Sequence, residues 1–175
     1  MTENIGELLT DQSQLSAKRS YDIVIENRQD LIDVSHVFLA LLDFPDEILL
    51  HVLDSLGIND VERLKAETRK VIKLQRKVPF WKGKRYRVFI TPLVKQSIDN
   101  AITLSKQLNL EKASSAHIFW GVIKTCFEDG QDQYEIPLKM REIFNNSNLT
   151  PETVFKILKE VNDQSKDEGS VEKDG

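Results

Sequence analysis

The sequence has a single cysteine, and it has neither a long apolar run nor a leader-like amino terminus. Cys126 cannot form a disulfide within the chain, and the lack of disulfides is typical of a reducing compartment. The longest apolar runs, such as residues 37–42 and 48–53, are much shorter than a membrane-spanning helix. Residues 1–7 are acidic and lack the basic and apolar parts of a signal peptide. We therefore expect a cytoplasmic protein that does not cross a membrane.

The sequence also lacks the patterns of nucleotide-binding, metal-binding and catalytic sites. Its seven glycines are scattered, and no GxxxxGK followed by Ser or Thr is present to hold nucleotide phosphates. His36, His51 and His117 do not have the paired spacing of metal ligands on a helix. His117 and Cys126 lie about 13 Å apart along one helix, which is too far for a nucleophile and its base. We expect a protein that is not an enzyme, with no catalytic residue, no cofactor and no metal.

The residues that are present are typical of a helical globular protein. The chain has 175 residues, of which 40% are apolar and 30% charged, with a net charge of −4. This length is enough for one core, or for two small cores fused along a shared face. Apolar residues recur at helical spacing after capping residues, and no segment has convincing strand alternation. Eight helices are predicted, at about residues 10–28, 34–43, 46–56, 60–76, 91–108, 115–127, 137–146 and 151–162.

Two pairs of residues recur at one common offset. Thr10 and Thr91 are 81 residues apart, and so are His36 and His117. Apolar residues of the two histidine segments also fall in the same register. Such an offset predicts one helical unit present twice, which favours a pseudo-symmetric docking module over a single-site enzyme. Because both histidines lie among apolar residues, we expect each imidazole to hydrogen-bond a backbone carbonyl.

The first copy resembles a known family. The opening Leu9-Thr10, the segment 32–42 that contains His36, and the segment 52–58 resemble the Clp amino-terminal repeat of the Clp/Hsp100 AAA+ unfoldases. The resemblance implies an all-α fold of eight helices, arranged as two pseudo-symmetric four-helix repeats. The segment 89–93, after its long linker, resembles the branch of the family that recycles contractile secretion sheaths. The predicted organisation is a flexible terminus (1–8), repeat 1 (9–76), a basic and aromatic linker (77–89), repeat 2 (90–162) and a disordered polar tail (163–175).

The resemblance implies binding and not chemistry. In this family the domain recruits substrates or adaptor proteins to the unfoldase, often through an apolar groove near the first helix of a repeat. The chain is then either a stand-alone partner of a Clp/Hsp100 machine or a piece of a longer AAA+ chain. Helix capping alone would also explain the two threonines. The residues predicted to bind a protein or peptide partner are Leu9, Thr10, Ser13, Phe89, Ile90, Thr91 and Val94.

A concentrated basic segment supports an alternative function. No acidic residue lies between Glu67 and Asp99, and this interval holds ten Lys and Arg residues, with Phe80, Trp81 and Tyr86 interleaved. Such a segment can bind phosphate backbones, so a nucleic-acid-binding helical protein that uses residues 69–87 is the alternative. A solvated linker, or one whose Trp81 or Phe89 packs back on the helices, would explain it too. Because the whole chain is acidic, an acidic protein partner is favoured over nucleic acid, with contacts at Lys77, Trp81, Lys82, Lys84, Arg85 and Arg87.

Overall fold

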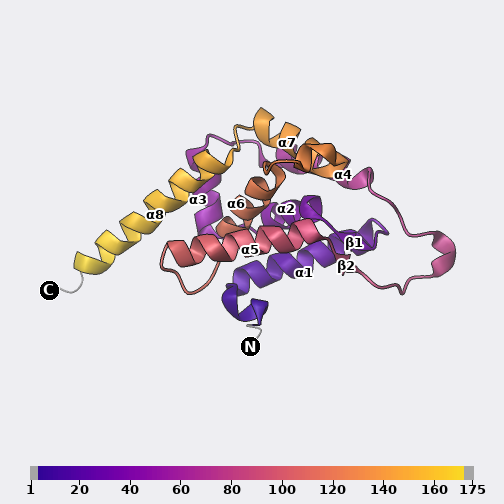
Figure 1. The fold of residues 1–175 in the computed structure, drawn as a ribbon, viewed down its shortest axis with the longest axis horizontal. Coiled ribbons are helices and arrows are strands. Elements are labelled where there is room, and N and C mark those ends of the chain that lie inside the picture. Colours follow the sequence, from indigo (N-terminus) through magenta and orange to yellow (C-terminus); the bar gives the residue numbers. More distant parts are fainter. Residues whose placement is uncertain (1–3, 172–175) are drawn as a thin grey trace.

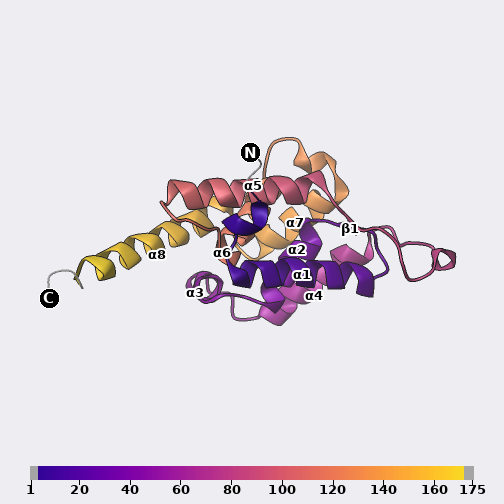
Figure 2. The same cartoon turned by 90° about the horizontal axis from the view of Figure 1, so that it is seen from below.

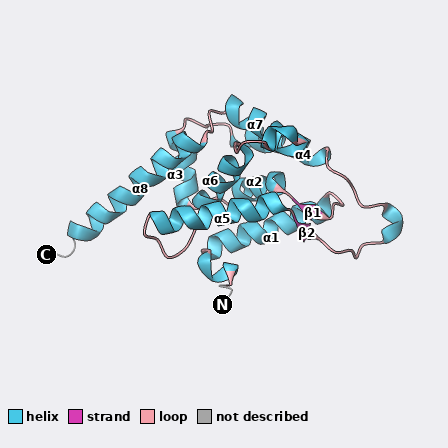
Figure 3. Cartoon of the chain, viewed as in Figure 1, coloured by secondary structure: helices cyan, strands magenta, loops and turns pink. Residues whose placement is uncertain are grey.

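The computed structural model describes residues 4–171, and helices make up most of this range (Figure 3). The part described contains eight α-helices in two sets of four, which confirms the predicted all-α fold of two repeats. None of the described helices is long and apolar enough to span a membrane. The first repeat consists of α1 (Asp11–Glu26), α2 (Val34–Asp43), α3 (Glu47–Ser55) and α4 (Val61–Lys73). The second consists of α5 (Pro92–Gln107), α6 (Ser115–Cys126), α7 (Glu135–Asn146) and α8 (Pro151–Val171).

Two very short strands were not predicted. Strand β1 (Leu31–Ile32) pairs in parallel with β2 (Phe89–Ile90), and Ile32 lies opposite Ile90. A strand of two residues is too short to give an alternating pattern, so the sequence carries no signal for it. Three 3₁₀ turns complete the described fold: η1 (Ile5–Leu8), η2 (Phe80–Lys82) and η3 (Gln131–Gln133).

The two ends of the chain differ from the predicted organisation. Residues 5–8 of the terminus expected to be flexible form η1, and α8 continues to Val171 through the tail expected to be disordered. Residues 1–3 and 172–175 lie outside the described part. Asn162 Nδ2 still donates to the backbone oxygen of Leu108, at 3.3 Å. Beyond this point α8 projects from the body at one end, while the linker before β2 projects at the other (Figure 1).

The backbone pairings follow the 81-residue offset and interlock the two repeats. Leu9 bridges Ala113 in parallel, as Ile90 pairs with Ile32. Adding 81 to Leu9 gives Ile90, and adding 81 to Ile32 gives Ala113. The opening segment of each repeat therefore pairs with the segment before the histidine helix of the other repeat. This exchange relates the two repeats by a pseudo-twofold axis.

The core lies on this axis, where α2 and α6 meet. Phe38 of α2 and Phe119 of α6 are equivalent under the offset, and their rings stack at 5.2 Å between centroids. Phe144 of α7 packs against Phe38 with its edge, at 5.0 Å. All three side chains are fully buried, and each aromatic pair adds about 0.5–1.5 kcal/mol to the gain from area burial. Because one apolar cluster includes residues of both repeats, we expect them to unfold together.

The two histidines close the amino-terminal caps of their helices. Nδ1 of His36 accepts the backbone N–H of Asp33 at 3.0 Å, and Nδ1 of His117 accepts that of Ser114 at 2.9 Å. The predicted bond to a backbone carbonyl is therefore wrong, because each ring accepts a hydrogen bond from a backbone N–H where it was expected to donate one to a backbone oxygen. Each histidine takes the place of the Glu or Gln that usually completes a capping box. His36 Nε2 also contacts Oε1 of Gln29, at 2.7 Å.

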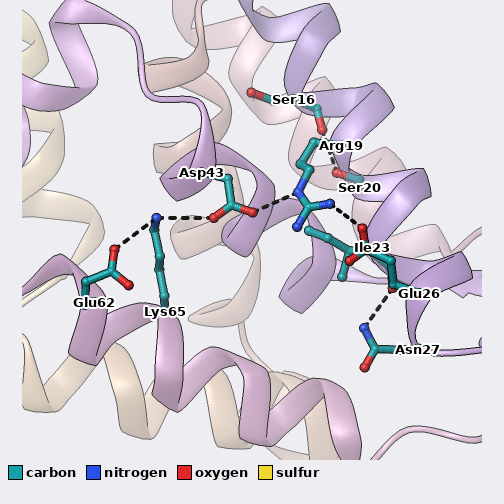
Figure 4. A network of polar contacts seen from close by, with 9 residues as sticks. All are labelled: Ser16, Arg19, Ser20, Ile23, Glu26, Asn27, Asp43, Glu62 and Lys65. Carbon is teal, nitrogen blue, oxygen red and sulfur yellow. Dashed lines mark hydrogen bonds and ion pairs between the residues drawn. The ribbon is translucent and has the colours of Figure 1, made fainter.

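A chain of charges holds three helices of the first repeat together (Figure 4). Asp43, at the end of α2, pairs with Arg19 Nε of α1 at 2.9 Å and with Lys65 Nζ of α4 at 3.3 Å. Arg19 also pairs with Glu26, which lies seven residues further along α1, at 2.7 Å. The side chain of Asp43 is largely buried, so its charge is satisfied by two cations from two neighbouring helices. This network fixes α1 against α2 and α4 beside the site described next.

Candidate functional site

A small apolar cavity lies between α1 and α5, where the two repeats meet. Its volume is about 80 Å³, and both repeats line it. Several lining residues are equivalent under the 81-residue offset, so the cavity lies on the pseudo-twofold axis. Seen from below, α5 and α1 run lengthwise one beneath the other with η1 between them (Figure 2). The lining residues are Leu9, Ser13, Ser16, Ala17, Ser20, Ile32, Val37, Leu41, Ile90, Val94, Ile98 and Ile118.

A wider hollow continues this cavity to the surface. Its volume is about 510 Å³, and Ile90 and Ile98 line both spaces. Two large apolar side chains stand at its edge: Ile90 is 59% exposed and Ile5 is 43% exposed. We call the combined feature the junction groove and define it by Ile5, Leu9, Ala17, Ile90, Val94 and Ile98. It is an open, mainly apolar depression whose inner part is the narrower.

The structure brings together four of the seven residues predicted to bind a partner. Leu9, Ser13, Ile90 and Val94 line the cavity. Leu9, Ser13 and Val94 are buried and form its floor and walls, while Ile90 is open to solvent. The sequence pointed to a groove near the first helix of a repeat, whereas the structure shows one groove shared by the first helices of both repeats.

Thr10 and Thr91 cap the amino-terminal ends of α1 and α5. Thr10 Oγ1 accepts the backbone N–H of Ser13 at 3.3 Å, and Thr91 Oγ1 accepts that of Val94 at 3.5 Å. The hydroxyl of Thr91 also donates to Asp33 Oδ1 at 3.1 Å. Burial raises the pKa of the Asp33 carboxyl, although this hydroxyl and a backbone N–H act in the opposite direction. Thr91 thus links the caps of α5 and α2, and it borders the outer hollow.

Phe89 does not contribute to the junction groove. It is exposed beside Ile90 in β2, and successive side chains of a strand point to opposite faces. Ile90 therefore faces the groove and Phe89 faces away from it. Phe89 does not pack back on the helices either, since more than half of its surface is open to solvent.

The floor of the groove carries a row of serines on α1 that sequence analysis recognised only in part. Ser13 Oγ donates to the backbone oxygen of Thr10 at 2.7 Å, and Ser20 Oγ donates to that of Ser16 at 2.9 Å. Ser16 Oγ is buried and has no hydrogen-bond partner. An unpaired buried hydroxyl costs about 1–3 kcal/mol. The only sequence signal was the helical spacing of three serines on an apolar face.

The basic residues predicted to contact an acidic partner lie outside the groove. They belong to the projecting segment that joins α4 to β2 (Figures 1 and 2). The alternative in which Trp81 packs back on the helices is wrong, because this side chain is 71% exposed. All six predicted contact residues are exposed: Lys77, Trp81, Lys82, Lys84, Arg85 and Arg87.

The single cysteine of the chain lies outside the junction groove. Cys126 is fully buried in α6, and burial raises the pKa of its thiol, so the reactive thiolate is disfavoured. No cluster of three or more His, Cys, Asp or Glu side chains that could hold a metal ion occurs in residues 4–171. The mainly apolar walls of the groove are suited to holding apolar groups.

Comparison with known proteins identifies the fold and the family. A family model described as the Clp repeat (R) N-terminal domain matches residues 8–129. The chaperone protein ClpB of Clostridium perfringens is 24% identical over 156 residues, which are 89% of this chain and 17% of that protein. The chain thus spans about a sixth of the length of this relative.

Solved structures agree with this assignment over most of the chain. The N-domain of ClpV from Vibrio cholerae is 19% identical, with a TM-score of 0.68 over 93% of this chain and 92% of that one. A complex of the ClpV N-domain with a VipB peptide is also 19% identical, with a TM-score of 0.60 over 87% and 89% of the two chains. These likenesses extend the shared fold beyond residue 129, into the last two helices. With the family match over more than half of its length, the chain belongs to the Clp repeat N-terminal domain family.

Proposed function

We propose that this protein is a docking module that binds an apolar peptide segment of another protein in the junction groove. Through this contact it recruits substrates or adaptors to a Clp/Hsp100 AAA+ chaperone or protease, or regulates such a machine. The proposed activity needs no cofactor and no catalytic residue. The observation that carries the proposal is the pair of exposed isoleucines, Ile5 and Ile90, at the edge of a groove whose floor is apolar.

The geometry favours a segment with a narrow apolar stripe. The inner part of the groove has a volume of about 80 Å³, which is room for one or two side chains and not for a whole helix. The open part has about 510 Å³ beside Ile5 and Pro92, where a backbone can lie. An amphipathic helix or an extended peptide binds in this way, with anchoring side chains in a pocket. The complex of a ClpV N-domain with a VipB peptide supports peptide binding by this fold.

The unpaired hydroxyl of Ser16 adds a polar feature to this apolar site. Ser16 lines the cavity from α1, and its buried Oγ atom lacks a hydrogen-bond partner in the free protein. A donor or acceptor brought in by the bound segment would satisfy it and recover part of the free energy lost by its burial. We therefore expect a bound segment that places a small polar group among its apolar anchors.

We expect a variant with both Ile5→Asp and Ile90→Asp to lose partner binding by at least about tenfold, because each lost isoleucine contact is worth about 1.5–3 kcal/mol when fully buried. Both side chains are exposed in the free protein, so the fold should persist. Leu9→Asp is unsuitable, because Leu9 is buried in the core. Binding is measured by pull-down from native lysate with identification of bound proteins, followed by titration with the purified partner.

The matched control replaces two equally exposed apolar residues outside the groove. Leu50 and Leu138 are 52% and 41% exposed, and Leu50→Asp with Leu138→Asp adds the same charge. We expect this control to retain its partners. If no AAA+ protein or client is captured, or if the groove variant keeps its partners while circular dichroism shows a preserved fold, the proposed function is wrong.

A further inference from the structure

The segment of residues 77–88, which we call the basic loop, is an exposed feature that lies outside the junction groove. It projects from the end of the molecule opposite α8 (Figures 1 and 2). Its tip is the turn η2, where Phe80 is 85% exposed and Trp81 is 71% exposed. Two neighbouring aromatic side chains with this exposure leave apolar surface in water, and apolar surface gathered at one place is typical of interaction sites.

The base of the basic loop is fixed to the body of the protein. The side chain of Arg28 donates to three backbone oxygens of the loop: Val78 at 3.0 Å, Pro79 at 2.7 Å and Gly83 at 3.2 Å. The backbone N–H of Val78 donates back to the oxygen of Arg28 at 2.7 Å. The side chain of Val78 is buried. These contacts hold both sides of the η2 turn, so the aromatic tip is presented in one place and less entropy is lost when it binds.

The charges of the basic loop are not compensated within the chain. Its five cations, Lys77, Lys82, Lys84, Arg85 and Arg87, form no ion pair in the described part of the protein. Ten of the 24 Lys and Arg residues lie between Glu67 and Asp99, where no acidic residue occurs. The other 14 are set against all 28 Asp and Glu residues. The loop is therefore a positive projection on a negative body.

This charge distribution favours an acidic protein segment over a nucleic acid or an anionic membrane as the partner of the basic loop. A nucleic acid duplex or an anionic membrane carries negative charge over a surface wider than the loop, so the acidic body would be repelled wherever it came near. A short acidic protein segment can satisfy the loop without reaching the body. Lys82 Nζ lies over the Trp81 ring, 5.8 Å from its centroid, so one face of the indole is already occupied and stacking between two bases is disfavoured.

We propose that the basic loop is a second docking site, which binds an acidic protein segment that also carries apolar side chains. Its carboxylates pair with the five cations, and its apolar groups cover Phe80 and the free face of Trp81. This site is separate from the junction groove, and it neither requires nor excludes the function proposed for that groove.

The test titrates the whole protein with a short fluorescent peptide in which Asp and Glu alternate with Leu and Phe. We expect binding, seen as a rise in anisotropy, that weakens as salt is added because the loop charges are exposed to screening. A change in tryptophan emission should accompany it. Since Trp120 is buried and Trp81 is exposed, that change reports Trp81, and Trp81→Ala should abolish it and weaken binding.

Charge reversal gives the matched comparison. We expect a variant with Lys82→Glu, Lys84→Glu and Arg85→Glu to bind at least about tenfold more weakly, since each exposed pair contributes up to about 1 kcal/mol. The control carries Lys156→Glu, Lys159→Glu and Lys166→Glu on α8, where all three lysines are exposed. This control has the same net charge as the loop variant, and we expect it to bind the peptide nearly as well as the wild type.

Four results would overturn the proposal. These are no binding of the acidic peptide at low salt, equal binding of a peptide with Asn and Gln in place of its acids, an equal loss in the α8 control, and tighter binding to a single-stranded oligonucleotide or to phosphatidylserine vesicles at the same salt. The oligonucleotide result would favour the nucleic-acid-binding alternative, and the vesicle result would make the loop a membrane contact.

Discussion

Replacing Gly121 by alanine is expected to lower the free energy of unfolding by about 3 kcal/mol, at the upper end of the usual cost of overpacking a core. Gly121 lies in α6 where this helix crosses α5, and a Cβ atom placed on it would lie 2.2 Å from the backbone oxygen of Ser97. It would also lie 3.3 Å from the backbone nitrogen of Ala101. Both neighbours are main-chain atoms of α5, so the two helices must separate to admit one methyl group.

Replacing glycine by alanine within a helix usually raises the free energy of unfolding, whereas at Gly121 it is expected to lower it. Alanine is favoured over glycine within a helix by about 1 kcal/mol, so a net loss of stability can come only from the contact between α5 and α6. No smaller side chain at Ser97 can relieve the clash, because the backbone makes it. The equivalent position in the first repeat is Ala40, which is fully buried and does carry a Cβ. The two repeats therefore do not cross their first two helices in the same way.

Urea unfolding followed by circular dichroism measures the effect of Gly121→Ala. The control is Gly6→Ala in η1, where the nearest atom to an added Cβ is a side-chain oxygen at an ordinary 3.5 Å. We expect this control to stay within about 0.5 kcal/mol of the wild type. Equal unfolding midpoints for Gly121→Ala and the wild type would show that α5 and α6 lie further apart than the structure places them.

The helices and their pairing into repeats could be predicted because their signals are local. Thr91-Pro92 combines a capping oxygen with a proline that fits the first helical turn, and α5 begins at Pro92. Where two local signals compete, the start shifts slightly. Helix α4 begins at Val61, after its cap Asp60, where the predicted range began at residue 60, and α7 begins two residues before Pro137. A difference of this size does not change which face of a helix is buried.

Features that depend on contacts between the repeats could not be predicted. The seven glycines look alike in the sequence, and only the crossing of α5 over α6 gives Gly121 its special role. Ile5 lies in a segment with no helical periodicity, yet η1 places it at the edge of the junction groove. The groove needs α1 and α5 at the same time. The offset of 81 residues predicts two equivalent helices, but it does not tell whether their apolar faces form two grooves or one.

The histidines illustrate a different limit. Their position among apolar residues predicted burial, and His36 and His117 are both buried. The direction of their hydrogen bonds depended on the cap geometry, which the sequence suggested only through Asp33 and Ser114. In both helices the backbone N–H of the capping residue points at the ring nitrogen. A ring nitrogen that accepts this hydrogen bond must carry no proton of its own, so each cap requires a neutral histidine.

This requirement predicts a loss of stability in mild acid. Burial lowers the pKa of His36 from 6.5 to about 4, and burial also lowers the pKa of His117, against the opposing charge of Asp46. As the pH falls below 6.5, His36 binds a proton in the unfolded chain, whereas in the folded protein it stays neutral until about pH 4. At His36 the unfolded state is then favoured by about 1.4 kcal/mol per pH unit, and the lowered pKa of His117 acts in the same direction. His36 alone should account for roughly 3 kcal/mol between pH 6.5 and pH 4.

The variant His36→Gln separates this effect from the titration of carboxylates. Glutamine is a usual partner in a capping box and can accept the backbone N–H of Asp33, but it does not titrate. We therefore expect His36→Gln to be less stable than or similar to the wild type at pH 7.5, and to lose less stability on acidification to pH 4.5. Urea unfolding at a series of pH values measures both quantities.

His51→Gln provides the matched loss of an imidazole, because His51 is exposed on α3 and caps no helix. Its stability should change with pH as that of the wild type does, so that only the His36 variant has a shallower slope. If stability changes with pH in the same way for all three proteins, the folded state binds a proton on His36 without losing stability. The cap of α2 would then not require a neutral histidine. A shallower slope for His36→Gln alone would assign the acid sensitivity to the cap of α2, whose Asp33 also holds Thr91 at the border of the junction groove. Acid would then loosen the groove together with the fold, and partner binding should weaken over the same pH range.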